Sequence, residues 1–130
     1  MRLLFGNDDK IVSVKFSKDG KYLATASYDS KIIIWDANSF SKKLEIISTI
    51  DKFNYSGLVS IDFSPDSRYI ASGSNRGNVI LWDAFSGRQV QILPSPNFSV
   101  YNVEFSPNGK YLAVSLLNSQ VMFIILKTGR

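Results

Sequence analysis

The chain has 130 residues, of which 45% are hydrophobic, and a formal net charge of +4. This length can bury one modest core, provided that the fold it encodes is complete within it. Cysteine and histidine are both absent, which excludes a disulfide framework, a thiolate metal site, a cysteine nucleophile, and the commonest general base and metal ligand. We therefore expect no catalytic residues, no metal and no cofactor.

The basic residues are spread along the chain, and only Lys42 and Lys43 form a doublet. Because no run of five or six like charges occurs, we expect a solvated surface and no nucleic-acid interface. The longest apolar stretches have five or six residues, far fewer than a membrane span needs. The first six residues have too short an apolar core for a secretory signal. We therefore expect a cytoplasmic or nuclear protein.

The predicted elements begin with an apolar run at residues 2–5 that can pair as one short strand. A first unit follows, with β-branched and aromatic residues at 11–16, small residues at 22–27 and an apolar run at 31–35, all of which predict strands. Asp and Gly in residues 17–20 and Asp in residues 28–30 indicate turns between these strands. Residues 44–49 predict a fourth strand.

The second unit repeats this order, with strands predicted at 58–63, 69–73, 78–82 and 88–93. The third unit predicts strands at 100–105, 111–115 and 121–125, and has no fourth. Both units have a turn with proline, at Pro65 and Pro107, between the first two strands. Three units of short strands and turns, without an indicated helix, predict an all-β fold.

The units align on a phenylalanine that ends the first strand of each, namely Phe16, Phe63 and Phe105. The periods are 47 (63 − 16) and 42 (105 − 63) residues. A Trp-Asp pair begins 19 residues after the first two of these phenylalanines, at Trp35 and at Trp82. Four short strands in about 40–45 residues is the period of a β-propeller blade.

The Phe-Ser turns, the Ala-Ser strands and the terminal Trp-Asp pairs resemble the WD-repeat β-propeller family over nearly the whole chain. The resemblance implies blades that are four-stranded antiparallel meanders. It divides residues 1–130 into repeats at about 10–50, 57–94 and 99–126, with residues 2–5 as a spare outer strand. Three blades are too few for a ring of the usual four to eight.

Three accounts of the missing blades remain open. The chain is a segment of a longer propeller, or copies of it assemble into a ring of six or nine blades, or a different protein completes the ring. Exposed sheet edges would otherwise invite aggregation.

The resemblance also implies a structural network of a His, a Ser or Thr, an Asp and the Trp in each blade. The first unit retains Asp29 and Trp35, with a hydroxyl from Thr25 or Ser27. Trp82 is kept in the second unit, and no unit has the His. We expect the network to be incomplete in every unit, and we expect structural roles for Trp35, Asp29, Trp82, Phe16, Phe63 and Phe105.

Partner-binding candidates come from loops that, by the resemblance, open onto the top face of the propeller. Tyr28, Asn75 and Leu117 directly precede the second-turn Asp position of each unit. Aromatic residues also lie in or near the loops that enter the first strands, namely Tyr55, Phe98 and Tyr101. They are candidates because loops on rigid scaffolds commonly carry function. Ordinary loop structure is the alternative for the first three residues, and packing back onto the blade is the alternative for the last three.

The resemblance predicts a non-catalytic scaffold whose partners are other proteins or peptides. A structural subunit whose blade edges complete a larger assembly is the main alternative, and a basic surface for nucleic acid or phospholipid headgroups is a weaker one. Asp8 and Asp9 do not suggest a metal or acid–base pair, because adjacent side chains in a turn diverge and no third ligand is in view.

Overall fold

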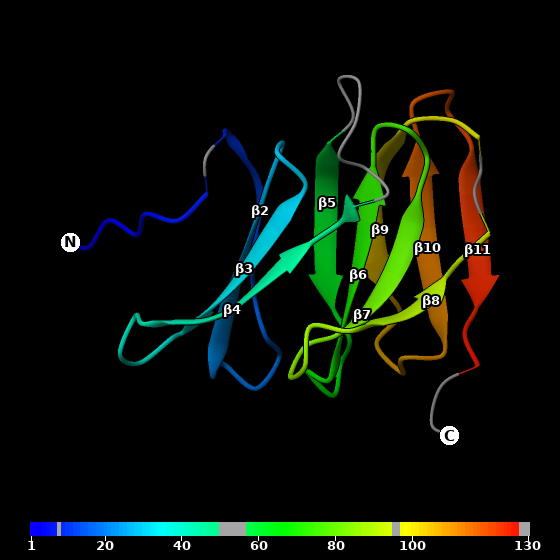
Figure 1. The fold of residues 1–130 in the computed structure, drawn as a ribbon. Coiled ribbons are helices and arrows are strands. Elements are labelled where there is room, and N and C mark those ends of the chain that lie inside the picture. The colour runs from blue at the N-terminus through cyan, green and yellow to red at the C-terminus, as the bar shows by residue number, and fades with distance from the viewer. Residues whose placement is uncertain (8, 50–56, 95–96, 128–130) are drawn as a thin grey trace.

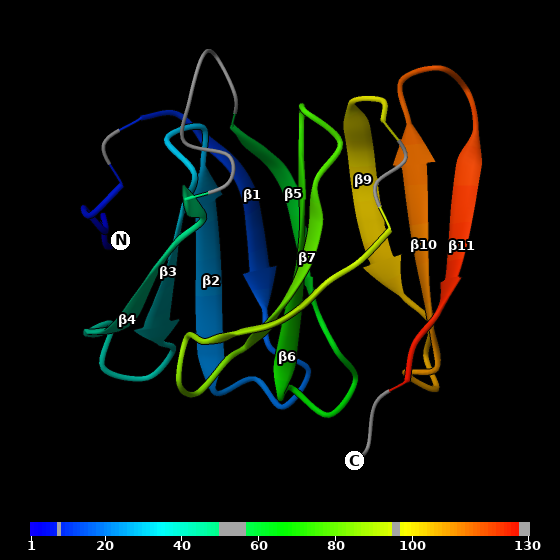
Figure 2. The ribbon, with the colours of Figure 1, turned by 45° about the vertical axis from the view of Figure 1, so that its right-hand side comes forward.

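The chain folds into three antiparallel sheets that stand side by side in chain order (Figures 1 and 2). The structure is a computed structural model and describes residues 1–7, 9–49, 57–94 and 97–127. The first and second sheets have four strands each, and the third has three. The strands are β1 (Ile11–Phe16), β2 (Tyr22–Ser27), β3 (Lys31–Asp36), β4 (Lys42–Ile47), β5 (Leu58–Phe63), β6 (Tyr69–Ser74), β7 (Val79–Asp83), β8 (Gln89–Ile92), β9 (Val100–Phe105), β10 (Tyr111–Leu116) and β11 (Val121–Ile125).

Each sheet is a simple meander, because consecutive strands pair with one another. The register repeats as well: Phe16 is opposite Leu23, Phe63 is opposite Ile70 and Phe105 is opposite Leu112. The predicted all-β class is thus confirmed. The first two units are four-stranded meanders as predicted, and the third sheet has three strands among the described residues. In both views the first and third sheets lie at the two ends of the row (Figures 1 and 2).

The turn between the first two strands has the same hydrogen bonds in every sheet. In the second sheet, Ser64 Oγ donates to Asp66 Oδ1 at 2.6 Å and accepts the Tyr69 N–H at 2.9 Å. The first sheet uses Ser17 and Asp19 in this way, and the third uses Ser106 and Asn108. The aspartate and asparagine side chains therefore shape turns, as Asx residues commonly do.

The aspartate of each Trp-Asp pair forms the turn that leads into the fourth strand. Asp36 Oδ1 accepts the N–H groups of Asn38 and Ser39, both at 2.8 Å, and Asp83 makes the matching pair of bonds in the second sheet. These N–H donors, chiefly that of Ser39, lower the pKa of Asp36. The third sheet has Ile125 at this position and, within residues 97–127, no fourth strand.

The apolar core lies between the sheets and consists of two clusters. One joins the first sheet to the second and contains Ile34 and Phe63, and the other joins the second to the third and contains Leu81 and Phe105. The repeated phenylalanine therefore packs toward the preceding sheet. Phe63 is 1% exposed, whereas Phe16, which has no preceding sheet among the described residues, is 62% exposed.

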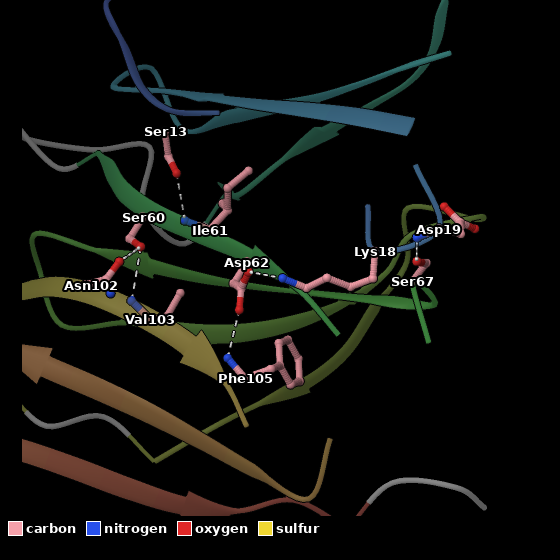
Figure 3. Close-up of polar contacts among 10 residues, drawn as sticks. All are labelled: Ser13, Lys18, Asp19, Ser60, Ile61, Asp62, Ser67, Asn102, Val103 and Phe105. Carbon is pink, nitrogen blue, oxygen red and sulfur yellow. Dashed lines mark hydrogen bonds and ion pairs between the residues drawn. The ribbon is translucent and has the colours of Figure 1, made fainter. Parts of the chain in front are cut away.

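Side chains on the inner strands also connect neighbouring sheets by hydrogen bonds (Figure 3). Ser60 Oγ accepts the Val103 N–H at 3.1 Å, and Asp62 Oδ2 accepts the Phe105 N–H at 2.8 Å. Between the first two sheets, Ser13 Oγ accepts the Ile61 N–H at 3.4 Å, near the limit of a hydrogen bond. Because they satisfy buried N–H groups, these bonds fix the position of each sheet on the next.

The residues before β1 cross the open side of the first sheet. Residues 2–5, predicted as a spare outer strand, belong to no sheet. Gly6 lies against two side chains of β3, since a Cβ at Gly6 would be 2.8 Å from Ile33 Cδ1 and 3.1 Å from Trp35 Cη2. This contact buries Trp35, which would otherwise be on an open face.

Asn7 completes the hydrogen-bond network of the first sheet. Trp35 Nε1 donates to Thr25 Oγ1 at 3.1 Å, and Thr25 Oγ1 donates to Asn7 Oδ1 at 2.9 Å. Asn7 Nδ2 donates to Ser27 Oγ at 2.8 Å, and Ser27 Oγ donates to Asp29 Oδ1. Asn7 thus takes the place of the His that the resemblance implies. The prediction that the network is incomplete in every unit is therefore wrong for the first unit.

Candidate protein-interaction surface

Three of the predicted partner-binding residues lie at one end of the three sheets. Tyr28 is in the β2–β3 turn, Asn75 in the β6–β7 turn and Leu117 in the β10–β11 turn. These turns gather at the upper edge of Figure 1. They lie together because each sheet is the same meander and because the sheets stand side by side with the same strand directions.

The three residues line one cavity of about 400 Å³. The predicted residue Tyr101 lines it as well. The described residues that line it are Lys10, Val12, Tyr28, Val59, Asn75, Ser99, Val100, Tyr101 and Leu117. All three sheets therefore contribute to the cavity, and four of the six predicted partner-binding residues meet there.

Tyr28 and Asn75 are held in place by hydrogen bonds across the first junction. Asn75 Nδ2 donates to Tyr28 Oη at 2.7 Å, and Asn75 Oδ1 accepts the Gly57 N–H at 2.9 Å. Gly57 is pressed against the neighbouring turn, because a Cβ there would be 2.3 Å from the Tyr28 carbonyl oxygen. Since this wall of the cavity is preorganised, a ligand would lose little entropy in ordering it.

The opposite wall comes from the third sheet and is open to solvent. Leu117 and Tyr101 are both more than half exposed. Lys10 is the one charged residue among the described residues of the lining, and its Nζ lies 5.8 Å from the centre of the Tyr28 ring. The described lining thus offers a leucine, two phenols, an amide and an ammonium group, and it contains no carboxylate.

The structure places the predicted residue Phe98 elsewhere. Phe98 is half exposed and does not line the cavity. Its backbone packs instead on the β6–β7 turn, where a Cβ at Gly77 would be 2.7 Å from the Phe98 carbonyl oxygen. Tyr55 lies outside the described residues.

Sequence reasoning missed the other members of the lining, although the repeat contains the signal. Val12 and Val59 are 47 residues apart and Val59 and Tyr101 are 42 apart, as are the phenylalanines on which the units align. The three therefore occupy the same position in successive sheets. Only the aromatic Tyr101 stands out in the sequence, because valine in a strand is expected in any core.

Among the described residues, no group of three His, Cys, Asp or Glu side chains is placed to hold a metal ion. A separate cavity near the inner strands, lined by Lys15, Lys18, Asp62 and Glu104 among others, contains the ion pair of Lys18 Nζ and Asp62 Oδ1 at 3.4 Å. No helix in the described part of the chain is long and apolar enough to cross a membrane.

Comparison with solved structures shows the same arrangement of blades. The chain superposes on the crystal structure of the RRP9 WD40 repeats with a TM-score of 0.85 and 22% identity, over 94% of this chain and 37% of that one. It superposes on the Cps50 (Swd1) β-propeller domain of Myceliophteria thermophila with a TM-score of 0.79 and 24% identity, over 94% and 38%. The chain thus spans less than two-fifths of either propeller.

Comparison by sequence gives the family. No curated protein matches the chain significantly. A family model described as "WD domain, G-beta repeat" matches residues 1–36, 46–83 and 87–123, which is most of the chain and one match for each sheet. The matches, the Trp-Asp turns and the blade geometry agree, and the chain therefore belongs to the WD-repeat (WD40) family of β-propeller proteins.

Proposed function

We propose that the chain is a non-catalytic interaction module that binds a segment of another protein in the cavity lined by Tyr28, Asn75, Tyr101 and Leu117. WD40 propellers are generally protein-interaction scaffolds. The observation that carries the proposal is the convergence of turn side chains from all three sheets on one cavity.

The lining suggests the chemistry of the bound segment. Tyrosine is enriched among the residues that dominate interface energies, and two tyrosines together with Leu117 form an apolar seat for one large side chain. Lys10 is exposed, and none of the described lining residues is a carboxylate. We infer a peptide that inserts an apolar or aromatic residue and places a carboxylate near Lys10.

The experiment is a selection from a displayed library of short random peptides, followed by affinity measurement of the enriched peptides by fluorescence polarisation. We expect Tyr28→Ala and Leu117→Asp each to weaken binding roughly tenfold or more, which corresponds to about 1.4 kcal/mol. Phe85→Ala is the control, because Phe85 is exposed and does not line the cavity. Peptides that bind both cavity variants as tightly as the unchanged chain would refute the site.

The dependence on salt separates this proposal from a basic surface for nucleic acid or phospholipid headgroups. Nucleic-acid binding falls steeply with salt because condensed counterions are released. A peptide seated mainly by apolar contacts should lose only the contribution of Lys10. A steep loss of affinity between low and physiological salt would favour the charged ligand.

A further inference from the structure

The third sheet has an apolar face that nothing described covers. Within the chain, the side of the second sheet that meets the third contains Ala71, Val79 and Leu81, all buried. The equivalent residues of the third sheet are Ala113, Val121 and Phe123, each 42 positions later. Phe123 is 64% exposed, stacks on Tyr111 at 4.9 Å between ring centres, and lines an open hollow with Val121.

The first sheet has an uncovered face of the opposite kind. The sides of the second and third sheets that meet a preceding sheet contain the buried pairs Ile61 and Phe63 and Val103 and Phe105. The equivalent pair of the first sheet is Val14 and Phe16, and both are more than half exposed. The chain therefore has one free copy of each half of its own sheet-to-sheet junction.

These two faces fit each other, because the chain joins such faces twice internally. Ile34 shares a cluster with Phe63, and Leu81 shares one with Phe105. Phe123 has the position of Ile34 and Leu81 in the third unit. Phe16 has the position of Phe63 and Phe105 in the first unit. We propose that a second copy of this chain docks head to tail, with its Val14 and Phe16 seated on Val121 and Phe123 of the first copy.

The polar groups of the internal junctions support the same pairing (Figure 3). Ser60 and Asp62 of the second sheet accept N–H groups of the third, and Asn102 and Glu104 have their places on the third sheet. Asn102 Oδ1 already accepts the Ser60 hydroxyl at 2.9 Å within the chain. Glu104, which has the place of Asp62, is exposed and would meet the Phe16 N–H group of the second copy.

The head-to-tail pairing also closes. Two copies form two identical junctions, each between the third sheet of one copy and the first sheet of the other, and together they supply six blades. Propellers with four to eight blades are common. Closure covers both open faces at once and prevents the endless growth that a heterologous contact otherwise permits.

The segment before β1 leaves the relevant part of the first sheet accessible. Gly6 and Asn7 lie over β3 and β2, against Ile33, Trp35 and the hydroxyl of Thr25. The exposed Val14 and Phe16 are on β1. The docking face is thus the β1 side of the first sheet, which meets the apolar face of the third sheet.

The test is the molar mass of the 130-residue chain by light scattering over a range of concentrations. We expect about 29.2 kDa (2 × 14.6) for the chain as it is. Phe123→Glu and Phe16→Glu should each give 14.6 kDa, since a charge at either face breaks both junctions. Phe85→Glu should leave the dimer intact, because Phe85 is exposed but lies on neither face. Far-UV circular dichroism will confirm that each variant is folded.

A mixture of the two monomeric variants separates head-to-tail docking from other dimers. One of the two junctions between Phe123→Glu and Phe16→Glu chains has two unchanged faces, so the mixture should regain a mass near 29.2 kDa. A mixture that stays monomeric would overturn the proposal. A monomeric unchanged chain would overturn it too and would leave the open face of the third sheet to a different protein or to further blades. A dimer that survives Phe16→Glu would show pairing of like faces, which contradicts it.

Discussion

Asp62 is the group whose removal should most sharply reveal how one blade is attached to the next. Its side chain is almost completely buried, at 3% exposure, and its Oδ2 accepts the buried Phe105 N–H at 2.8 Å. Asp62→Ala removes this acceptor and leaves the N–H without a partner. A hydrogen bond to a charged group contributes about 1.5–3 kcal/mol, so we expect the free energy of unfolding to fall by about 2–3 kcal/mol.

The ion pair with Lys18 contributes less. Lys18 Nζ is 3.4 Å from Asp62 Oδ1, and the lysine side chain is half exposed, so Lys18→Ala should cost less than about 1 kcal/mol. Asp62→Asn is the matched variant, because it keeps an oxygen acceptor for the Phe105 N–H and loses only the charge. We expect its cost to lie between those of the other two variants.

The measurement is urea unfolding followed by far-UV circular dichroism at neutral pH. Asp62→Ala within about 0.5 kcal/mol of the unchanged chain, the usual range for surface substitutions, would refute the reasoning. Lys18→Ala as costly as Asp62→Ala would show that the ion pair, and not the hydrogen bond, holds the junction. If the free energy of unfolding of Asp62→Ala depends less steeply on urea concentration, the third sheet unfolds separately from the other two.

Three further changes test the remaining features. Asn7→Ala should cost about 1–3 kcal/mol in urea unfolding, because it removes the bonds to two hydroxyl groups of β2; an unchanged midpoint would show that the network has no weight. Gly77→Ala should lower Tm, since Gly77 has φ +86° and a Cβ would meet the Phe98 carbonyl; a raised Tm would contradict this. The turn N–H groups lower the pKa of Asp36 and Asp83 in the folded chain. The two carboxylates therefore stabilise the fold at pH values above their ordinary pKa of about 3.9. This stabilisation is lost as the pH falls through and below that value. Asp83→Asn should therefore unfold with a smaller difference between pH 5 and pH 3, and an unaltered difference would exclude the role.

The fold was predictable from the sequence because it is written three times. Strand ends, turns and the missing fourth strand all follow from aligning Phe16, Phe63 and Phe105, and a pattern that recurs is hard to mistake for chance. Burial was less predictable. Equal positions in the repeat suggest equal environments, yet Phe16 is exposed and Phe63 is buried, because burial depends on whether a neighbouring sheet covers the residue.

The cavity was predictable in part for the same reason. Tyr28, Asn75 and Leu117 share one position in the repeat, so their convergence follows once the sheets stand side by side. Asn7 was missed because the search was for a histidine, whereas an amide can both donate and accept a hydrogen bond. Asn7 lies nine residues before Phe16. Asn54 lies nine before Phe63, but it is outside the described residues.

The placement of the two tryptophans determines what light emission can report about this molecule. Trp35 and Trp82 are both 5% exposed, one beneath Gly6 and the other inside the first junction, and the sequence has no third. Indole emission therefore monitors the first two blades, whereas the third contributes only tyrosine signal. If the circular dichroism signal is lost at a lower urea concentration than the one that shifts indole emission to the red, the third blade unfolds before the first two. The difference between the two midpoints measures how much more stable the first two blades are.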